Sequence, residues 1–422
     1  MIIIENIKAV FRPFYTKLKL YKSNYVRRRN LQELQSVKQI RCVFLALFDS
    51  VWKYDKVYEK MLLDNRFDPI ILICPVVNFG DENMVERMSQ CEMFFEKKGY
   101  KYICAYDKKT KHYIDLRKEL KPDIIFYTNP YKGLIDDRYY IDNFCDELTV
   151  FVPYGMGESA EYRMLYNQRF HNLLWRRYAE TNIHKEISEE YSDRKGENVV
   201  VTGYPGIEDL IIDQKATANI WPSNDTSKRK IIWAPHHTLN AIGKINYSCF
   251  LQYDNFMLEM ARKYRDHIQI AFKPHPLLRN KLIDLWGKEK TDEYYSKWKG
   301  SENTCVQEGE YVDLFKTSDA MIHDSSSFIG EYLYVNKPVL RTVKDKLDMT
   351  AHNKFGVECI KRHYLAYSEQ DIEDFIKNVI NGIDPLKESR TQFLNDVLIP
   401  KNGLPSDNII DDIIDSINNL RV

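Results

Sequence analysis

Short apolar runs of strand length alternate with stretches of helical periodicity along most of the chain. After residue 38, runs that predict buried strands occupy residues 40–48, 70–74, 102–105, 124–127 and 148–152. Between the second and third of these, Met84, Met88, Cys91 and Phe95 recur on one face of a predicted helix. Strands separated by helices predict a parallel sheet with helices on both sides. No G-x-G-x-x-G follows the first strand, so this Rossmann-like domain is not assigned a dinucleotide.

A second series of the same kind begins after a charged stretch, residues 176–198, which predicts a domain boundary. Further strands are expected at 199–202, 231–234, 268–272, 320–322 and 339–340, and a last amphipathic helix at 409–420. The predicted organisation is an N-terminal extension (1–38), a first domain (39–195), a second domain (196–390) and a C-terminal helical segment (391–422). Two doubly wound α/β domains in succession are expected to face each other across a ligand-binding cleft.

Composition excludes several classes of protein. Lys and Arg together number 61, as do Asp and Glu, so the chain has no overall field to attract nucleic acid. Eight cysteines without a C-x-x-C pair predict free thiols in a reducing cytoplasm rather than disulfides or a zinc site. No apolar run approaches the roughly 18 residues of a membrane span, and residues 1–10 lack the basic start of a signal peptide.

The extension 1–38 has its own character, because basic residues alternate there with aromatic and aliphatic ones. This pattern is typical of a segment lying on an anionic membrane surface, which would place the protein peripherally on the inner face of the plasma membrane. A solvated helix that packs on the first domain is the alternative, and the sequence leaves both open.

Residues 318–338 form the most informative stretch, with the pattern strand, polar turn, helix. The turn holds Ser325, Ser326 and Ser327. Backbone amides at the start of a helix, with these hydroxyls, would bind a phosphate or pyrophosphate. An ordinary helix cap is the alternative.

Two histidine motifs follow other predicted strands of the second domain. His236 and His237 come after strand 231–234, and only one is expected to face the cleft, because successive side chains of an extended segment point to opposite sides. No ligand at i+4 or acidic neighbour completes a metal site there, so none is predicted. His275 lies between two prolines that fix its backbone, with Lys273 just before, which suits a residue that holds a phosphate or moves a proton.

Two turns near the ends of predicted strands carry weaker signals. In the first domain, Tyr154 and Gly155 are followed by a carboxylate, Glu158. Gly203 and Pro205 form a tight turn after strand 199–202.

The motifs together resemble the CDP-glycerol glycerophosphotransferase family. The resemblance rests on Ala-Pro-His-His at 234–237, Lys-Pro-His-Pro at 273–276 and Ser-Asp-Ala-Met-Ile-His-Asp-Ser-Ser-Ser at 318–327, followed by Glu331. It implies a GT-B fold and a CDP-alditol donor, and CDP-glycerol is the first candidate for that donor. It also implies transfer of the alditol phosphate to a hydroxyl of a glycan or lipid-linked acceptor, with release of CMP, in teichoic-acid-like or capsule polysaccharide synthesis. Neither a metal nor another cofactor is expected.

The resemblance places His275 on the donor phosphates, Ser325 and Ser326 on the pyrophosphate, and Asp324 and Glu331 in the same motif. The full set predicted to bind the donor is Gly203, Pro205, Lys273, His275, Asp324, Ser325, Ser326, Ser327 and Glu331.

The chain departs from the family at the catalytic base. The family's Trp-His-Gly aligns with residues 153–155, where tyrosine replaces the histidine. A tyrosine with a pKa of about 10 is a poor base at neutral pH. His236 or His237 is therefore the first candidate and Glu158 the second, with Tyr154 and Gly155 contacting the acceptor. Two other functions stay open: a GT-B glycosyltransferase with Glu158 as base, and a homologue that binds nucleotide without catalysis.

Overall fold

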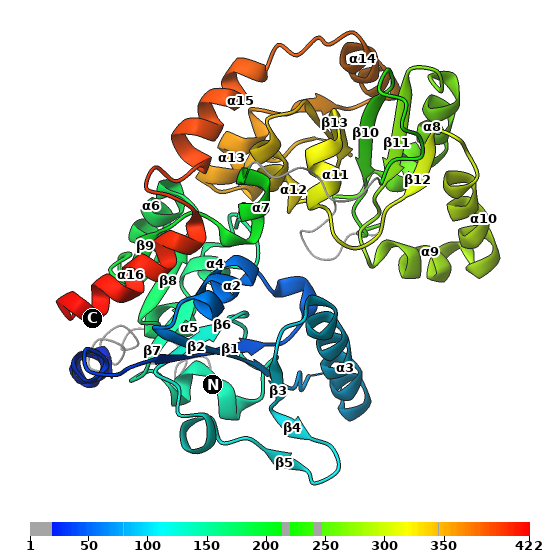
Figure 1. Cartoon of the computed structure of the whole chain (residues 1–422). Helices are drawn as coiled ribbons and strands as arrows, with labels where there is room; N and C mark the ends of the chain where they lie inside the picture. The colour runs from blue at the N-terminus through cyan, green and yellow to red at the C-terminus, as the bar shows by residue number, and fades with distance from the viewer. Residues whose placement is uncertain (1–18, 79, 213–219, 240–246, 345) are drawn as a thin grey trace, which may run out of the picture. The chain divides into compact units, whose positions relative to one another are not determined.

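The computed structural model of the chain describes residues 19–78, 80–212, 220–239, 247–344 and 346–422. It divides into two compact units (Figure 1). The first comprises the described residues up to Gly157, together with Glu161–Glu208 and Pro400–Val422; the second comprises Glu158–Ala160 and Asp209–Ile399. Of the N-terminal extension, residues 1–18 lie outside the described residues, and residues 19–34 are helical.

The first unit is built on a parallel sheet that has seven strands in the described part of the chain. Its order is β3-β2-β1-β6-β7-β8-β9, so the strand order reverses between β1 and β6. The strands are β1 (Ile40–Ala46), β2 (Phe67–Ile73), β3 (Tyr102–Cys104), β6 (Ile124–Tyr127), β7 (Leu148–Phe151), β8 (Arg176–Ala179) and β9 (Val199–Val201). The helices include α2 (Asp55–Leu63), α3 (Asp81–Lys98), α4 (Tyr162–Tyr166), α5 (Arg169–Leu173), α6 (Asn182–Tyr191) and α16 (Pro405–Asn419).

The predicted boundary between the domains is wrong at β8 and β9. The charged stretch contains β8, and β9 pairs with β8 in the first sheet instead of opening the second. Both arginines of β8 are buried: Arg176 Nε lies 3.3 Å from a carboxylate oxygen of Asp412, and Arg177 donates to the hydroxyl of Ser188. Because Asp412 pairs with Arg176 and Ser188 accepts a hydrogen bond from Arg177, charge density did not mark an exposed linker.

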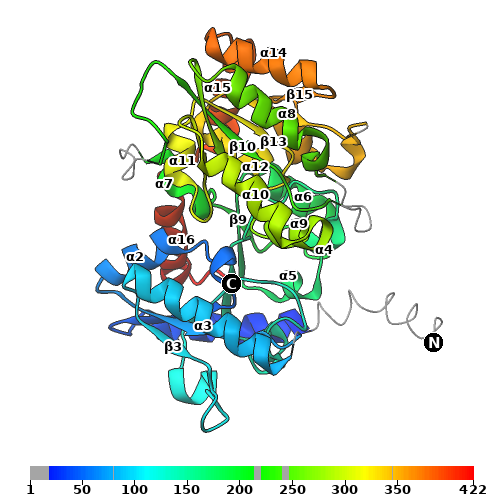
Figure 2. The same ribbon diagram turned by 90° about the vertical axis from the view of Figure 1, so that its right-hand side faces the viewer.

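The C-terminal segment does not form a separate part. The chain crosses back at Pro400, and α16 lies beside α2 in the first unit in both views (Figures 1 and 2). Lys60 of α2 pairs with Asp407 at 2.5 Å and with the buried Glu208 at 3.5 Å. The apolar face predicted for the last helix is confirmed by its buried isoleucines, which include Ile409, Ile413 and Ile417.

The second unit contains a second parallel sheet, six-stranded in the described residues, in the order β12-β11-β10-β13-β14-β15. The strands are β10 (Arg229–Ala234), β11 (Ile268–Phe272), β12 (Thr304–Val306), β13 (Ala320–His323), β14 (Val339–Thr342) and β15 (Tyr364–Ala366). The helices include α8 (Phe250–Lys263), α9 (Leu278–Trp286), α10 (Lys288–Lys299), α11 (Val312–Thr317), α12 (Phe328–Glu331), α13 (Lys354–Ile360), α14 (Glu369–Ile380) and α15 (Lys387–Phe393).

Register in this sheet brings three strand ends to one level. Trp233 of β10 is level with Phe272 of β11, and Ala234 is level with His323 of β13. The strand order reverses between β10 and β13, so this edge is the topological switch point, where open α/β sheets bind ligands. The predicted α/β architecture of two Rossmann-like sheets is therefore confirmed.

The cysteines and the lengths of the helices were also considered in the sequence. All eight cysteines are free thiols, as predicted, and Cys104 and Cys305 are only partly buried. Every helix in the described ranges is too short or too polar to cross a bilayer.

Candidate functional site

Three histidines from two loops meet at the switch point of the second unit. His236 and His237 follow β10, and His275 follows the neighbouring β11. The ring centroids of His236 and His237 are 4.3 Å apart, those of His237 and His275 4.2 Å, and those of His236 and His275 5.0 Å. The sequence predicted that only one of the adjacent pair would face the site, but both rings contact His275.

These imidazoles are neutral at pH 7. Burial, with the neighbouring rings adding to it, lowers the pKa of His236 to about 3 and that of His275 to about 4. Burial also lowers the pKa of His237. Nδ1 of His275 accepts a hydrogen bond from the backbone N–H of Leu277 at 3.1 Å, so the ring proton is on Nε2. His275 can therefore donate a hydrogen bond to an anionic ligand.

Asp324, directly after β13, ties the loops together. One carboxylate oxygen accepts from the backbone N–H of His236, and the other accepts from that of Cys249 at 2.7 Å. Burial raises the pKa of Asp324 to about 6, because its two backbone hydrogen bonds only partly offset the loss of hydration. At neutral pH the residue is mostly ionised, and its role is to position the loop that carries the histidines.

The serine turn occupies the predicted place between β13 and α12. Ser325 is buried, Ser326 half-buried and Ser327 exposed. Ser327 stands at the cap position of α12 but makes no capping hydrogen bond, so the alternative of an ordinary cap is not supported. The helix is short: α12 has four residues and continues as a 3-10 turn, η6 (Tyr332–Val335). The turn therefore offers backbone amides and hydroxyls rather than the dipole of a long helix.

Lys273 and Glu331 are linked through a tyrosine that the sequence gave no reason to single out. The hydroxyl of Tyr311 donates to Glu331 at 2.7 Å, and the Lys273 ammonium lies 6.0 Å from the centre of the Tyr311 ring. Lys273 also donates to the carbonyl of Gly309 at 2.8 Å. Burial lowers the pKa of Lys273 to about 8.

Arg341 of β14 is a second residue that sequence reasoning missed. It is buried, donates to the carbonyl of Ser325 at 3.2 Å, and lies 5.7 Å from the ring centre of Tyr247. Burial lowers its pKa, and the nearby Asp324 opposes that effect. The available signal was a single arginine inside an apolar strand, which requires a nearby anion or a ligand.

Glu158 lies in the second unit beside α13 and is buried. Its carbonyl accepts the N–H of Asn353 at 2.9 Å, and a Cβ at Gly356 would lie 3.1 Å from the Cβ of Glu158. Its charge acts on Arg341. These contacts describe a packed residue rather than an exposed general base.

Gly203 and Pro205, predicted with the donor-binding domain, belong to the first unit. Gly203 has φ of +86° and packs so closely on Pro400 and Pro405 that any Cβ would overlap their rings. Tertiary packing at this turn explains why glycine is required.

Tyr154 and Gly155 also lie in the first unit, in the loop after β7. The Tyr154 hydroxyl is 3.1 Å from that of Tyr131, and burial raises the pKa of Tyr154 well above its usual value. This shift is opposite to what a catalytic base requires.

The histidine cluster could hold either of two kinds of ligand. One nitrogen from each of His236, His237 and His275 lies within 4.8 Å of the others, and neutral imidazoles bind cations such as Zn²⁺. The same rings can donate N–H hydrogen bonds to a diphosphate. The sequence argument against a metal considered only neighbours along the chain, whereas the third ring comes from the next strand.

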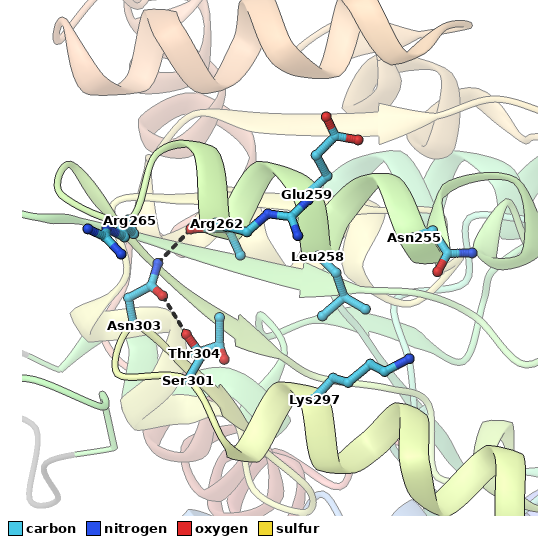
Figure 3. Close-up of a pocket in the computed structure, with 10 residues that line it drawn as sticks. Asn255, Leu258, Glu259, Arg262, Arg265, Lys297, Ser301, Asn303 and Thr304 are labelled. Atoms are coloured by element: carbon cyan, nitrogen blue, oxygen red, sulfur yellow. Dashed lines mark hydrogen bonds between the residues drawn. The ribbon is translucent and has the colours of Figure 1, made fainter.

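A cavity of about 570 Å³ on the second unit is separate from this cluster (Figure 3). It lies between α8 and α10, near the start of β12, and its lining includes Arg262, Lys297 and Asn303. Asn303 donates to the carbonyl of Ala261 at 2.9 Å, which closes one side. Since these residues precede the strands, the cavity is at the amino edge of the sheet and the histidines are at the carboxyl edge.

The fold places the chain in the GT-B class. The wall teichoic acid polymerase TagF has a TM-score of 0.59 at 15% identity, over 97% of this chain and 98% of TagF. A UDP complex of S. aureus MnaA has a TM-score of 0.57 at 16% identity, over 90% and 97%. At these identities the likeness establishes the fold.

Family membership follows from the sequence match. The profile of the CDP-glycerol:poly(glycerophosphate) glycerophosphotransferase family matches residues 156–415, more than half of the chain, and the chain belongs to that family. The minor teichoic acid biosynthesis protein GgaB of Bacillus subtilis strain 168 is 24% identical over 250 residues. That match covers 55% of this chain and 25% of GgaB, so the chain spans about a quarter of its relative's length.

Proposed function

We propose that the chain transfers an alditol phosphate from a CDP-alditol to an acceptor hydroxyl and releases CMP. Glycerol phosphate is the first candidate for the transferred group. The reaction would serve the synthesis of a teichoic-acid-like or capsule polymer. The observation that carries this proposal is the convergence of His275, Asp324 and the serine turn at one switch point. Membership of the glycerophosphotransferase family supports the reaction class.

The donor diphosphate would be held by neutral donors and one cation. Nε2–H of His275, the amides and hydroxyls of the Ser325–Ser327 turn, and the ammonium of Lys273 can together offset its charge. Arg341 would hold the turn by its hydrogen bond to Ser325. We propose that this set needs no metal.

In the reaction, the acceptor oxygen attacks the phosphorus that bears the alditol, and the bond to the bridging oxygen breaks. CMP leaves with that bonding pair, and the acceptor proton passes to a base. Among the three histidines, we propose His237 for this role, because Nδ1 of His275 already accepts from Leu277 and Nδ1 of His236 lies 3.0 Å from the hydroxyl of Thr238. The buried Nδ1 of His237 has no hydrogen-bond partner in the described part of the chain.

Purified protein incubated with an acceptor and CDP-glycerol, CDP-ribitol or a UDP-sugar tests the proposal. Release of CMP, undiminished by EDTA, supports the phosphotransferase without a metal. Release of UDP would instead establish a glycosyltransferase, and binding without turnover would establish a nucleotide-binding homologue. Loss of activity in EDTA that Zn²⁺ restores would assign the histidines to a metal.

The titration of Lys273 is expected to make kcat/KM for the CDP-alditol depend on pH. Below its pKa of about 8 the ammonium is charged and attracts the diphosphate; above it the neutral amine does not. We expect kcat/KM for the CDP-alditol, which reports the free enzyme, to be level near pH 7 and to fall above pH 8. In Lys273→Arg the guanidinium stays charged, so the decline should disappear. An identical decline in both proteins would exclude Lys273 as its source.

We also propose that the protein works peripherally on the cytoplasmic face of the plasma membrane through its N-terminal helix. Residues 19–34 bury Leu20, Arg27 and Leu31 against the first unit. The opposite face is aromatic and basic: Tyr21 and Tyr25 are 79% and 77% exposed. Rings at the headgroup level and cations toward anionic lipid are typical of interfacial helices.

Charge reversal tests this membrane contact. The double substitution Arg28→Glu with Arg29→Glu should lower the affinity for phosphatidylglycerol vesicles, measured by co-sedimentation, at least tenfold. The reason is that each cation near such a surface contributes about 1 kcal/mol. The control, Lys108→Glu with Lys109→Glu, makes the same change in net charge at exposed positions between β4 (Tyr106–Asp107) and β5 (His112–Tyr113). Equal losses for the two variants would show that net charge, not this face, governs binding.

A further inference from the structure

The loop that follows β7 ends in two carbonyl groups that are held by side chains from later in the first unit. Nε2 of His184, on α6, lies 2.8 Å from the carbonyl oxygen of Met156. The hydroxyl of Tyr166, at the end of α4, donates to the carbonyl of Gly157 at 3.1 Å. These contacts arise because α6 follows β8, and β8 is hydrogen-bonded beside β7.

The hydrogen bonds of His184 define the state of its ring. A carbonyl oxygen only accepts, so Nε2 carries the ring proton and donates to Met156. Burial lowers the pKa of His184, so the ring is neutral at pH 7 and Nδ1 has a lone pair. That lone pair accepts from the hydroxyl of Thr181 at 2.8 Å. The carboxylate of Glu180 is 4.0 Å from Nδ1, beyond hydrogen-bond distance, and does not compete with Thr181.

His184 packs directly on the backbone of the loop. The residue is fully buried. Gly157 has φ of +51°, and a Cβ there would lie 3.1 Å from the hydroxyl oxygen of Tyr166 and 3.9 Å from Cδ2 of His184. A buried ring with a hydrogen bond at each nitrogen has little freedom to move, and the group that its Nε2 holds belongs to a loop rather than to a helix or strand.

The loop held in this way carries Tyr154 and Gly155, which are predicted to contact the acceptor. Tyr154 precedes Met156 by two residues and follows β7, so it lies at the carboxyl edge of the first sheet, where α/β sheets bind ligands. A shift of the Met156 carbonyl would therefore move the acceptor contacts. Misplacement of a positioning group by about 1 Å costs an enzyme up to about 100-fold in rate.

We infer that His184, oriented by Thr181, is a positioning residue for the acceptor, because it fixes the Met156 carbonyl and with it the loop that carries Tyr154. The inference rests on the proposed function and deepens it. It assigns a buried residue of α6 to acceptor binding and leaves it without a part in donor binding.

Glutamine and asparagine at position 184 test this role, because each amide replaces one ring nitrogen. The longer glutamine reaches the place of Nε2 and can donate to Met156, whereas asparagine reaches only the place of Nδ1. A glycerol phosphate trimer serves as the acceptor, since the family's name includes poly(glycerophosphate). We expect His184→Asn to raise KM for the trimer about tenfold or more, and His184→Gln to recover most of that loss. KM for CDP-glycerol should not change in either variant.

Two further variants of the full chain complete the comparison. His171→Asn is the matched control, since His171 is a second buried histidine of the first unit and its Nδ1 accepts from the backbone of Gln168. It should keep both KM values. Thr181→Val removes the hydroxyl that orients the ring and should raise KM for the trimer, whereas Thr181→Ser should not. The Thr181 hydroxyl makes no capping hydrogen bond to α6, so this pair decides the question if the variants at position 184 do not fold.

Calorimetric binding of the trimer and hydrogen exchange of the peptide 152–158 provide readouts that need no turnover. The exchange should be faster, and the binding weaker, in His184→Asn than in wild type, His184→Gln and His171→Asn. If wild type releases no CMP but both readouts follow this order, the proposed reaction fails and the positioning role stands. The inference is overturned if the glutamine and asparagine variants behave alike, or if KM for CDP-glycerol rises as much as KM for the trimer.

Discussion

His275→Ala is expected to lower kcat/KM for the CDP-alditol about 100-fold. Its Nε2–H is fixed toward the ligand side because Nδ1 already accepts from Leu277. A hydrogen bond to a charged group contributes about 1.5–3 kcal/mol, and about 1.4 kcal/mol corresponds to a tenfold change in rate. Stability should change little, since the residue is only half-buried. Steady-state CMP release at varied donor concentration measures the effect.

The chain supplies a matched control for this substitution. His267 lies just before β11, at the other end of the strand that His275 follows, and its side chain is exposed. His267→Ala should therefore leave kcat/KM unchanged. His275→Gln retains an N–H donor and should recover part of the loss. If His275→Ala and His267→Ala have equal activity, the donor phosphates do not bind at the histidine cluster.

Asp324→Ala is expected to lower the free energy of unfolding of the second unit by about 3 kcal/mol and to reduce donor capture at least tenfold. The substitution removes the acceptors of two backbone N–H groups, those of His236 and Cys249. Each unsatisfied buried donor costs about 1–3 kcal/mol. Removing the carboxylate also removes the cost of burying it, and this offsets part of the cost of the two unsatisfied donors. Activity falls because the loop that carries His236 loses its anchor.

Asp319 provides the comparison for Asp324. It precedes the same strand, β13, and accepts one backbone N–H, that of Lys230, at 2.7 Å in a partly exposed position. Asp319→Ala should cost about 1 kcal/mol and leave kcat/KM unaltered. Urea unfolding followed by tryptophan fluorescence measures both variants, and Trp233 reports on the second unit. An Asp324→Ala protein as stable and active as wild type would contradict the anchoring role.

Much of the fold was predictable because its signals are local. Strands such as β1, β6 and β11 were predicted within a few residues, since a buried parallel strand is a continuous apolar run. The missed strands were β8, whose two arginines carry charge into the core, the short β12 and β15, and the two-residue strands β4 and β5. For β8 the signal was absent from the strand itself, because a distant carboxylate, that of Asp412, pairs with Arg176. The other missed strands have only two or three residues each, too few to show a periodicity.

The candidate site divides in the same way. The motifs at 234–237, 273–276 and 318–327 predicted that histidines and serines lie at the ends of strands. Their grouping was not, because sequence order says nothing of which parallel strands are neighbours. Only hydrogen bonding of β10 between β11 and β13 brings His236 to His275 and to Asp324.

By itself the sequence determined the α/β class, the strand ends that carry polar groups, and the chemical types gathered there, because local periodicity and turn chemistry encode these. Tertiary structure alone decided that β9 and α16 belong to the first unit, that Arg341 and Tyr311 support the site, and that three histidines meet. Those outcomes depend on which distant surfaces bury each other, and the free energy of that burial is a property of pairs of segments rather than of any one of them.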